Sequence, residues 1–159
     1  TFETLFDACR TTQTPYLVAM IDADHFKHIN DTWGHSHGDW VLTKIAEVCT
    51  ESLRPTDVIG RFGGEEFVVA LPDTSSSDAQ MVAERLKKKV AELSLTEEMG
   101  KLRPSVTVGV AATDSEEADL ESLIKRADEM LYVGKRAGRN QVVVCSDVVE
   151  APDSPVGSK

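Results

Sequence analysis

Apolar positions follow two different periods along the chain, and their alternation predicts the order of the secondary-structure elements. Short apolar or β-branched runs favour strands. One of them, Tyr16–Ile21, is almost wholly apolar and ends at a cluster of aspartates, which is typical of a central strand buried on both faces. The remaining strand-like runs are Val58–Phe62, Phe67–Leu71, Ser105–Ala112 and Gln141–Cys145.

Helical spacing of apolar residues, at intervals of three and four, marks the segments between these runs. Residues 1–12 predict a leading helix that is cut at its front and ends before Pro15. A short polar helix, a loop containing Gly34 and Gly38, and a longer helix follow the first strand. The predicted helices after the leading one cover residues 25–32, 41–53, 79–95 and 120–131. The complete order is α-β-α-α-β-β-α-β-α-β.

The length of 159 residues, of which 41% are hydrophobic, suits one compact core. We expect a single domain over residues 1–145, with the leading helix at 1–15. Residues 146–159 are rich in Pro, Ser, Asp and Gly without periodicity, and predict a flexible C-terminal tail. The chain has neither an initiator Met nor a signal peptide, and we expect it to be a fragment of something longer.

The charge balance narrows the range of partners. Lys and Arg number 17 against 27 Asp and Glu, a net charge of −10, which argues against nucleic-acid binding through phosphate contacts. No apolar run approaches the ~20 residues of a membrane span, so no membrane contact is expected. The three cysteines form no C-x-x-C pair, which favours a cytoplasmic protein over a disulfide or zinc framework. A small phosphorylated ligand is compatible with this charge, because a metal ion can join carboxylates to phosphates.

Two pairs of acidic residues are the first candidates for chemistry. Asp22 and Asp24 end the apolar strand, and Glu65 and Glu66 occupy the tip of an expected hairpin. Clustered carboxylates repel one another unless a cation or proton holds them, and hard oxygen ligands suit Mg²⁺ or Mn²⁺. Taken alone, each pair is more readily explained by helix capping or a solvated turn. Gly63–Gly64 favours the ligand hypothesis for the second pair, since residues without a Cβ let a ligand approach the backbone.

Phosphate recognition also needs cations, and the chain has neither a P-loop nor a dinucleotide-binding glycine motif. Lys27 follows Asp22 closely, and Lys135 and Arg139 would be neighbours on one face if the last helix reached that far. Basic residues at a helix end also complement the helix dipole, so this pattern alone is weak. The four histidines, all within residues 25–37, lack an H-E-x-x-H motif and a cysteine partner, and we do not expect them to bind zinc.

Four motifs in sequence order resemble those of the GGDEF-type diguanylate cyclases. Arg61–Phe67 reads R-F-G-G-E-E-F, the GGEEF form of the family signature. Asp22–Asp31 looks like the family's D-x-D-x-F-K-x-I-N-D segment, and Gly34–Asp39 has its G-H-x-x-G-D spacing. Ala127–Asn140 is similar to the A-D-x-A-L-Y-x-A-K-x-x-G-R-N ending. The resemblance spans residues 16–145, essentially the whole domain.

The resemblance implies an α+β sandwich related to nucleotidyl cyclases and polymerase palm domains, with a central five-stranded mixed sheet surrounded by helices. It also implies a reaction in which two GTP molecules form cyclic di-GMP and two pyrophosphates. Each subunit of a homodimer would hold one GTP, and each 3′-hydroxyl would attack the α-phosphorus of the other nucleotide. An N-terminal sensor or regulatory domain would control this activity in the full-length protein, which can be membrane-anchored.

The family's metal-binding roles transfer to matching positions of this chain. Asp22 and Glu65 would bind two ions, Mg²⁺ or Mn²⁺, together with the Ala23 carbonyl, and Glu66 would serve the second ion. Glu65 is also the candidate for activating the 3′-hydroxyl. Two ions that bridge phosphate oxygens stabilise the charge of an in-line displacement, so the protein's main task is positioning.

Further positions would contact the nucleotide itself. Asn30 and Asp39 would read the guanine, because an amide and a carboxylate suit its acceptors and its donor edge. Lys27 would stabilise developing charge on the phosphates. The remaining expected substrate contacts are Lys135 and Arg139 at the phosphates, Gly63 and Gly64 beside the α-phosphate and ribose, and His35 near the substrate.

Arg54-Pro55-Thr56-Asp57 matches the R-x-x-D product-inhibition site of many family members, shortly before the signature. Arg85 on the next helix matches the secondary arginine of that site. In isolation, R-x-x-D is also an ordinary helix-end ion pair of little energetic worth. Its position and its partner favour an inhibitory site for cyclic di-GMP, where arginine suits bidentate contacts to phosphate and guanine.

Three departures from the family pattern stand out. Glu65 replaces the commoner Asp, as it does in active members. Gly134 stands where Ala is usual, and the leading D-x-L-T-G-L-x-N-R-R segment is absent.

Two alternatives to a cyclase stay open. One is a catalytically silent receptor for GTP or cyclic di-GMP, and the other is a related enzyme for another nucleotide. Receptors usually lose the signature acids that this chain keeps, and Asn30 and Asp39 argue against another base.

Overall fold

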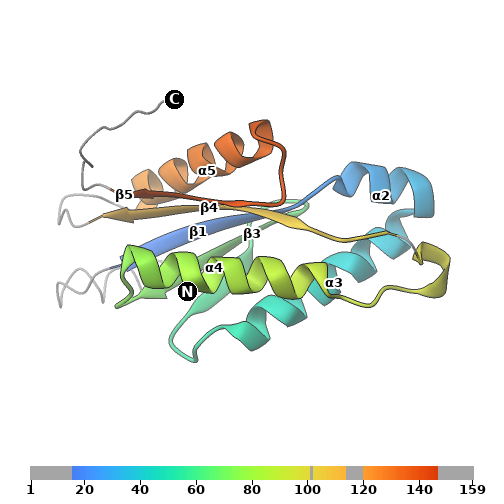
Figure 1. The fold of residues 1–159 in the computed structure, drawn as a ribbon, viewed down its shortest axis with the longest axis horizontal. Coiled ribbons are helices and arrows are strands. Elements are labelled where there is room, and N and C mark those ends of the chain that lie inside the picture. The colour runs from blue at the N-terminus through green and yellow to red at the C-terminus, as the bar shows by residue number, and fades with distance from the viewer. Residues whose placement is uncertain (1–15, 101, 114–119, 147–159) are drawn as a thin grey trace.

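Strands and helices follow the predicted order in the computed structural model of the chain, which describes residues 16–100, 102–113 and 120–146 (Figure 1). The strands are β1 (Tyr16–Ala23), β2 (Val58–Arg61), β3 (Glu66–Pro72), β4 (Val106–Thr113) and β5 (Val142–Ser146). The helices are α2 (Phe26–Trp33), α3 (His35–Ser52), α4 (Ser76–Ala91) and α5 (Leu120–Arg136), with a short 3₁₀ helix, η1, at Glu97–Met99. The predicted leading helix and the tail beyond residue 146 lie outside the described residues.

The five strands form one mixed sheet in the order β2-β3-β1-β4-β5. Strand β1 lies at its centre and runs antiparallel to both β3 and β4. Strand β2 pairs antiparallel with β3 as a hairpin, and β5 pairs parallel with β4. This arrangement confirms the expected α+β fold with a five-stranded mixed sheet.

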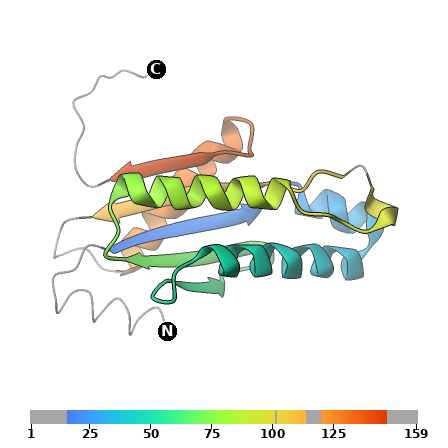
Figure 2. The ribbon, with the colours of Figure 1, turned by 60° about the horizontal axis from the view of Figure 1, so that its bottom comes forward.

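The sheet carries a separate apolar layer on each face, because successive residues of β1 point to opposite sides. Leu17 and Ile21 pack into the core formed with α3 and α4, whereas Val18 and Met20 pack against α5. Figures 1 and 2 show α5 on one side of the sheet and α3 and α4 on the other. Strand β1 is therefore buried on both faces, as its apolar run predicts. No helix in the described part of the chain is long and apolar enough to cross a membrane.

Three positions differ from the predictions. The sequence predicts a loop at Gly38, whereas this residue lies in the first turns of α3. A Cβ at Gly38 would overlap the Asn30 amide oxygen and crowd Phe26, so the glycine serves the close packing of α2 on α3. Glu66 begins β3 rather than lying at the hairpin tip, and Ser146 ends β5 rather than opening the tail.

Candidate active site

The carboxyl end of β1 lies beside the beginning of β3. The antiparallel register of these strands places Asp22 directly opposite Glu66. Asp22 is only 2% exposed, while 25% of the Glu66 side chain is exposed. Two carboxylates from distant parts of the sequence therefore share one end of the sheet.

A lysine from the opposite layer reaches both carboxylates. Lys135, in the last turn of α5, forms an ion pair with Asp22 Oδ2, and its Nζ lies 4.0 Å from Glu66 Oε2. The structure thus favours a role in the site over simple compensation of the helix dipole. One ammonium group faces two carboxylates, so the negative charge of the pair is only partly balanced.

Burial raises the pKa of Glu66 above its ordinary value, and the negative charge of Asp22 raises it further. Lys135 opposes this shift without cancelling it. Hard oxygen donors whose negative charge is only partly balanced fit a divalent cation. The ion pair of Asp22 with the Lys135 ammonium shows that this position already attracts positive charge.

No group of three or more His, Cys, Asp or Glu side chains that could hold a metal ion occurs within residues 16–100, 102–113 and 120–146. Any metal ion at the Asp22–Glu66 pair would therefore need further oxygen ligands from the backbone, water or a phosphate, a ligand set that Mg²⁺ commonly has. The Ala23 carbonyl is the nearest backbone candidate along the chain.

A backbone hydrogen bond links the hairpin tip to the end of β1. The Ala23 amide donates to the Glu65 carbonyl at 3.1 Å.

The tip of the β2–β3 hairpin is open at its glycines. The amides of Phe62 and Gly63 both donate to the Glu66 carbonyl, at 2.8 and 3.4 Å. Gly63 and Gly64 do not have positive φ angles. Among the described atoms, an added Cβ would meet nothing within 4 Å at Gly64 and only the Glu66 side chain, at 3.6 Å, at Gly63. The glycines therefore leave space for a ligand rather than serve the turn geometry.

Arg61 braces this tip, although the sequence motifs assign it no role. Its Nη2 donates to the Gly64 carbonyl at 2.6 Å and its Nε to the Gly63 carbonyl at 3.5 Å. The guanidinium also lies 5.7 Å from the centre of the Phe67 ring, within the range of a cation–π contact. The position of Arg61, two residues before Gly63, is the signal in the sequence that could have indicated this role.

Asp24 does not join Asp22, so the predicted acidic cluster at the end of the strand is wrong. The Asp24 carboxylate accepts hydrogen bonds from Ser105 Oγ and Thr107 Oγ1, both at 2.6 Å, and from the Asn140 amide at 3.0 Å. The physical reason is that Asp24 lies just past the last residue of β1, where the chain turns its side chain towards these donors. A buried carboxylate is stable there because it is hydrogen-bonded.

The candidates for reading guanine lie on α2 and α3, which meet at Gly34. Asn30 Oδ1 is buried and has no hydrogen-bond partner among the described residues. His35 and Asp39 are exposed near the start of α3. An unpartnered buried acceptor costs about 1–3 kcal/mol, so a donor group of a ligand would stabilise Asn30.

The two other phosphate candidates, Lys27 and Arg139, lie in α2 and in the turn after α5. The Lys27 side chain is 89% exposed and pairs with Asp31 of its own helix at 2.9 Å. Lys135 and Arg139 would share a helical face only if α5 reached Arg139, and the helix ends before that residue. Gly138, with a φ of 120°, and Arg139, with a φ of 64°, take the chain out of the helix.

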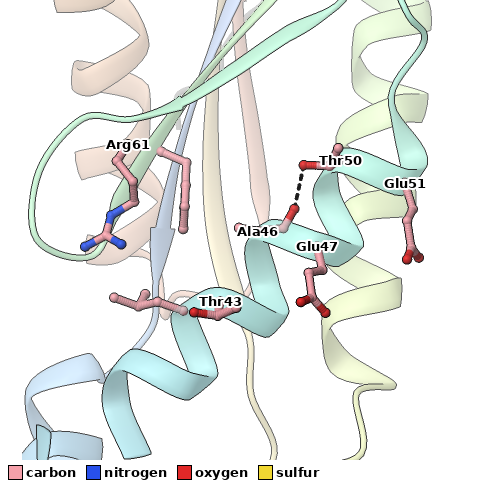
Figure 3. Close-up of a pocket in the computed structure, with 8 residues that line it drawn as sticks. Thr43, Ala46, Glu47, Thr50, Glu51 and Arg61 are labelled. Carbon is pink, nitrogen blue, oxygen red and sulfur yellow. Dashed lines mark hydrogen bonds between the residues drawn. The ribbon is translucent and has the colours of Figure 1, made fainter. Parts of the chain in front are cut away.

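A groove of about 460 Å³ lies between α3 and the β2–β3 hairpin (Figure 3). Figure 3 shows Arg61 entering it from the hairpin, with Thr43 and Ala46 entering from α3. The other lining residues are Leu42, Glu47, Thr50, Glu51 and Phe67. Thr43 Oγ1 donates to the Asp39 carbonyl at 3.0 Å, so the groove begins one helical turn from a candidate base contact.

The R-x-x-D segment forms a network at the opposite end of β3. Arg54 Nη2 donates to Asp57 Oδ1 at 2.9 Å, to the Pro72 carbonyl at 2.8 Å and to Thr74 Oγ1 at 2.7 Å. The hydrogen bond to Asp57 is the largest cause that raises the pKa of Arg54. The ion pair expected of such a segment is thus present, and it also ties the α3–β2 loop to the end of β3.

Arg85 of α4 approaches the same segment. Its Nη2 donates to the Ser52 carbonyl at 2.9 Å, at the end of α3 and just before Arg54. The structure therefore brings both predicted arginines to one end of α3, while their role in product binding stays a prediction.

The family model for the diguanylate cyclase GGDEF domain matches residues 1–141. The chain is a GGDEF domain. Diguanylate cyclase A of Treponema denticola is 42% identical to it over 127 residues, which are 80% of this chain and 34% of that protein. The response regulator PleD of Caulobacter vibrioides is 44% identical over 131 residues, 81% of this chain and 29% of PleD. This GGDEF domain thus spans about a third of the length of these curated relatives.

Solved structures share the fold of this GGDEF domain. The active GGEEF domain of a diguanylate cyclase from Vibrio cholerae aligns with a TM-score of 0.83 and 31% identity over 90% of both chains. The GGDEF domain of DgcB from Caulobacter crescentus, in complex with c-di-GMP, aligns with a TM-score of 0.83 and 31% identity over 89% of this chain and 84% of that one. Both likenesses agree with the family assignment and with the five-stranded α+β fold.

Proposed function

We propose that this GGDEF domain is a diguanylate cyclase, which condenses two GTP molecules into cyclic di-GMP and releases two pyrophosphates. The observation that carries the proposal is the Asp22–Glu66 carboxylate pair beside an open glycine hairpin, with Lys135 in reach of both acids. A relative named as a diguanylate cyclase at 42% identity supports it, as does the likeness to a GGEEF domain described as active.

We assign two Mg²⁺ or Mn²⁺ ions per active site to this end of the sheet. Asp22 and Glu65 would hold them together with the Ala23 carbonyl, and Glu66 would serve the second ion. Bound ions would stabilise the negative charge on phosphate oxygens during an in-line displacement. The raised pKa of Glu66 supports the assignment, because burial and then the negative charge of Asp22 disfavour its ionised form, which a cation would stabilise.

Basic side chains of the domain would hold the triphosphate. Lys135 already stands at the acidic pair, with 27% of its side chain exposed. Arg139 would reach the phosphates from the turn after α5. Lys27 forms an exposed ion pair with Asp31, which would exchange readily with a phosphate. Lys27 would stabilise charge in the transition state.

Asn30 and Asp39 would select guanine. The Asp39 carboxylate suits the donor edge of the base, and the buried Asn30 Oδ1, which has no hydrogen-bond partner among the described residues, suits a further donor group. The groove that begins near Asp39 has Leu42 and Phe67 in its lining, which would pack against the base. His35 lies at the same end of α3 and would stand near the substrate.

The reaction requires two copies of the domain, because each copy would hold one GTP. Glu65 would accept the proton of the 3′-hydroxyl, whose oxygen bonds to the α-phosphorus of the partner nucleotide as pyrophosphate leaves. The exposed hairpin tip supports a face-to-face homodimer, since Phe62 beside the glycines is 54% exposed and offers an apolar contact.

Arg54, Asp57 and Arg85 would form an inhibitory site for the product cyclic di-GMP. The Asp57 side chain is 1% exposed and holds Arg54, whose own side chain remains 49% exposed. A partly exposed, oriented guanidinium suits a bidentate contact with phosphate or guanine. The complex of the DgcB GGDEF domain with c-di-GMP supports product binding by domains of this kind.

We further infer that the domain acts in the cytoplasm as part of a longer signalling protein. Its substrate GTP would be supplied there, and an N-terminal sensor or regulatory domain would control it. The greater length of the curated relatives supports this inference.

The test is turnover of GTP with Mg²⁺, with cyclic di-GMP quantified by chromatography. Asp22→Asn should reduce product formation by at least about a hundredfold, because it removes a buried charge from the proposed metal set. Glu129→Gln, an exposed acid elsewhere on α5, is the matched control and should retain full activity. Binding of GTP without turnover would favour the receptor alternative, and equal use of ATP would favour a related enzyme for another nucleotide.

A further inference from the structure

One buried carboxylate, Asp24, has no part in the proposed reaction. It is 5% exposed, and three donors satisfy it. Ser105 Oγ and the Asn140 amide donate to Oδ2 at 2.6 and 3.0 Å, and Thr107 Oγ1 donates to Oδ1 at 2.6 Å. Hydrogen bonds to a charged acceptor are stronger than neutral ones. Because the donors engage both oxygens, this carboxylate is bound within the protein rather than presented to a metal ion.

These hydrogen bonds join three segments at one point, namely the end of β1, the start of β4 and the turn between α5 and β5. The Asp24 amide donates to the Ser105 carbonyl at 2.9 Å, and the Asn140 amide also contacts Thr107 Oγ1 at 3.0 Å. Asp24 and Asn140 are 116 residues apart in the sequence. The carboxylate is therefore the centre of a network that links distant elements.

The turn after α5 needs such a restraint. Arg139 and Asn140 have φ angles of 64° and 51°, in the left-handed region that residues with a side chain rarely adopt. Strained backbone of this kind persists only where the surroundings enforce it. The Asn140 amide is held by Asp24, and the Arg139 amide donates to the Gly134 carbonyl at 2.9 Å.

We propose that Asp24 is a positioning residue, which holds the α5–β5 turn through the Asn140 amide so that Arg139 is presented to the phosphates of the substrate. The inference rests on the proposed function, which gives Arg139 its phosphate contact. Asp24 itself does not touch the substrate. Loss of the Asp24 carboxylate should therefore weaken the binding of a nucleoside triphosphate more than that of a monophosphate.

Calorimetric titration of Asp24→Asn tests this role. The substitution keeps the shape of the side chain but replaces one acceptor oxygen with a donor, which cannot accept from the surrounding hydroxyl and amide groups. With the uncleavable α,β-methylene analogue of GTP and Mg²⁺, we expect Kd to rise about tenfold. With GMP, which lacks the β- and γ-phosphates, Kd should stay within about twofold. Arg139→Ala should add little in the Asp24→Asn background, because the two changes remove the same interaction.

A second pair of variants keeps the test independent of whether Asp24→Asn folds. Thr107→Val removes the hydroxyl that contacts both Asp24 and Asn140, and it should show the same selective loss. Thr96→Val is the matched control, since the buried Thr96 Oγ1 has no hydrogen-bond partner among the described residues, and both affinities should be unchanged.

Each outcome separates the positioning role from the proposed function. Equal weakening of the analogue and GMP, unchanged affinity for both, or a fully additive effect of Arg139→Ala would overturn the positioning role of Asp24. Failure of the unsubstituted protein to bind the analogue would overturn the proposed function instead.

Discussion

The charge balance at the end of β1 depends on three side chains. Asp22 and Glu66 face each other, and Lys135 supplies one positive charge to the two carboxylates. The pKa of Glu66 is raised mainly because the side chain is desolvated, and next because Asp22 is near. Ionised Glu66 therefore destabilises the ligand-free protein, and a bound cation would relieve this effect.

Glu66→Gln should raise the melting temperature of the ligand-free protein at pH 7 by a few degrees. The pKa of Glu66 is higher in the folded than in the unfolded state, so its favourable contribution exists at low pH and is lost as the pH rises through the folded-state value. The difference between variant and parent should vanish below about pH 4, where Glu66 is protonated in both states. Scanning calorimetry measures this, with Glu129→Gln as control. A lower melting temperature of Glu66→Gln at pH 7 would contradict the electrostatic explanation.

Single residues of the site could be predicted from the sequence, but their partners could not. The motifs show the acids and glycines, whereas the pairing of Asp22 with Glu66 depends on the register between β1 and β3, two strands that are not adjacent in the sequence. Asp24 looks like Asp22 in the sequence, and its partner Ser105 is 81 residues away. Non-local hydrogen bonds of this kind leave no local pattern.

At the scale of elements, two glycines fix helix α5 on the sheet. A Cβ at Gly109 of β4 would overlap the Leu131 amide and the Ala127 carbonyl, so the helix backbone lies directly on the strand. A Cβ at Gly134 would lie 2.6 Å from Thr107 Cγ2. This close seating carries the end of α5, and with it Lys135, to the acidic pair. The sequence shows Gly134 as a departure from the family pattern, but only the packing supplies a reason.

Gly134→Ala should fail to stabilise the protein, although the same change at an exposed helix position gains about 1 kcal/mol. The added methyl group would press on Thr107, whose hydroxyl is held by Asp24, and we expect a net loss of about 1 kcal/mol in the free energy of unfolding. Thr107→Ser removes the opposing methyl group and keeps the hydroxyl, so it should reverse most of the loss in the double variant. Urea denaturation measures both, and a gain of about 1 kcal/mol from Gly134→Ala alone would contradict the packing argument.

Arg54→Ala should weaken cyclic di-GMP binding at least tenfold and relieve product inhibition, because it removes the oriented guanidinium of the proposed inhibitory site. Initial rates before product accumulates should be unchanged, since the Pro72 contact of Arg54 lies at the end of β3 remote from Glu66. Titration calorimetry with cyclic di-GMP measures the affinity. Arg103→Ala, an exposed arginine outside this network, is the control. An unchanged affinity for Arg54→Ala would leave the segment with only its structural ion pair.

The order of the helices and strands could be predicted, because the spacing of apolar residues is a local property of the sequence. Some ends of these helices and strands could not be predicted. Helix α5 ends shortly before Gly138 and Arg139, which adopt positive φ angles, and the Asn140 amide that follows them donates to Asp24 across the molecule. A glycine at position 38 suggests a loop, yet Gly38 lies within α3. The residue is a glycine there because Asn30 occupies the space that a side chain would need.

At the scale of the whole molecule, a chain with a net charge of −10 is proposed to bind a polyanion and to meet a second copy of itself. Lys135 at the acidic pair would serve the first demand, and the exposed Phe62 at the hairpin tip would serve the second. The remaining negative charge opposes close approach of two copies. The dimer is therefore expected to be transient in the absence of substrate.

The rate of product formation per molecule of protein should rise with protein concentration, roughly in proportion while monomers predominate. The physical reason is that, in the proposed reaction, each active unit would need two copies, each with its own GTP. Initial rates over a dilution series measure this, with Arg54→Ala run in parallel so that product inhibition does not hide the slope. A constant rate per molecule, at concentrations where light scattering finds only monomers, would contradict a dimeric active unit.

Counting both products in a single reaction decides whether the domain is a cyclase. The protein is incubated at high concentration with GTP and Mg²⁺, and cyclic di-GMP and pyrophosphate are quantified together. We expect two pyrophosphates for each cyclic di-GMP, and at least about a hundredfold less of both products with Asp22→Asn. Bound GTP without either product, or pyrophosphate without cyclic di-GMP, would contradict the proposed reaction.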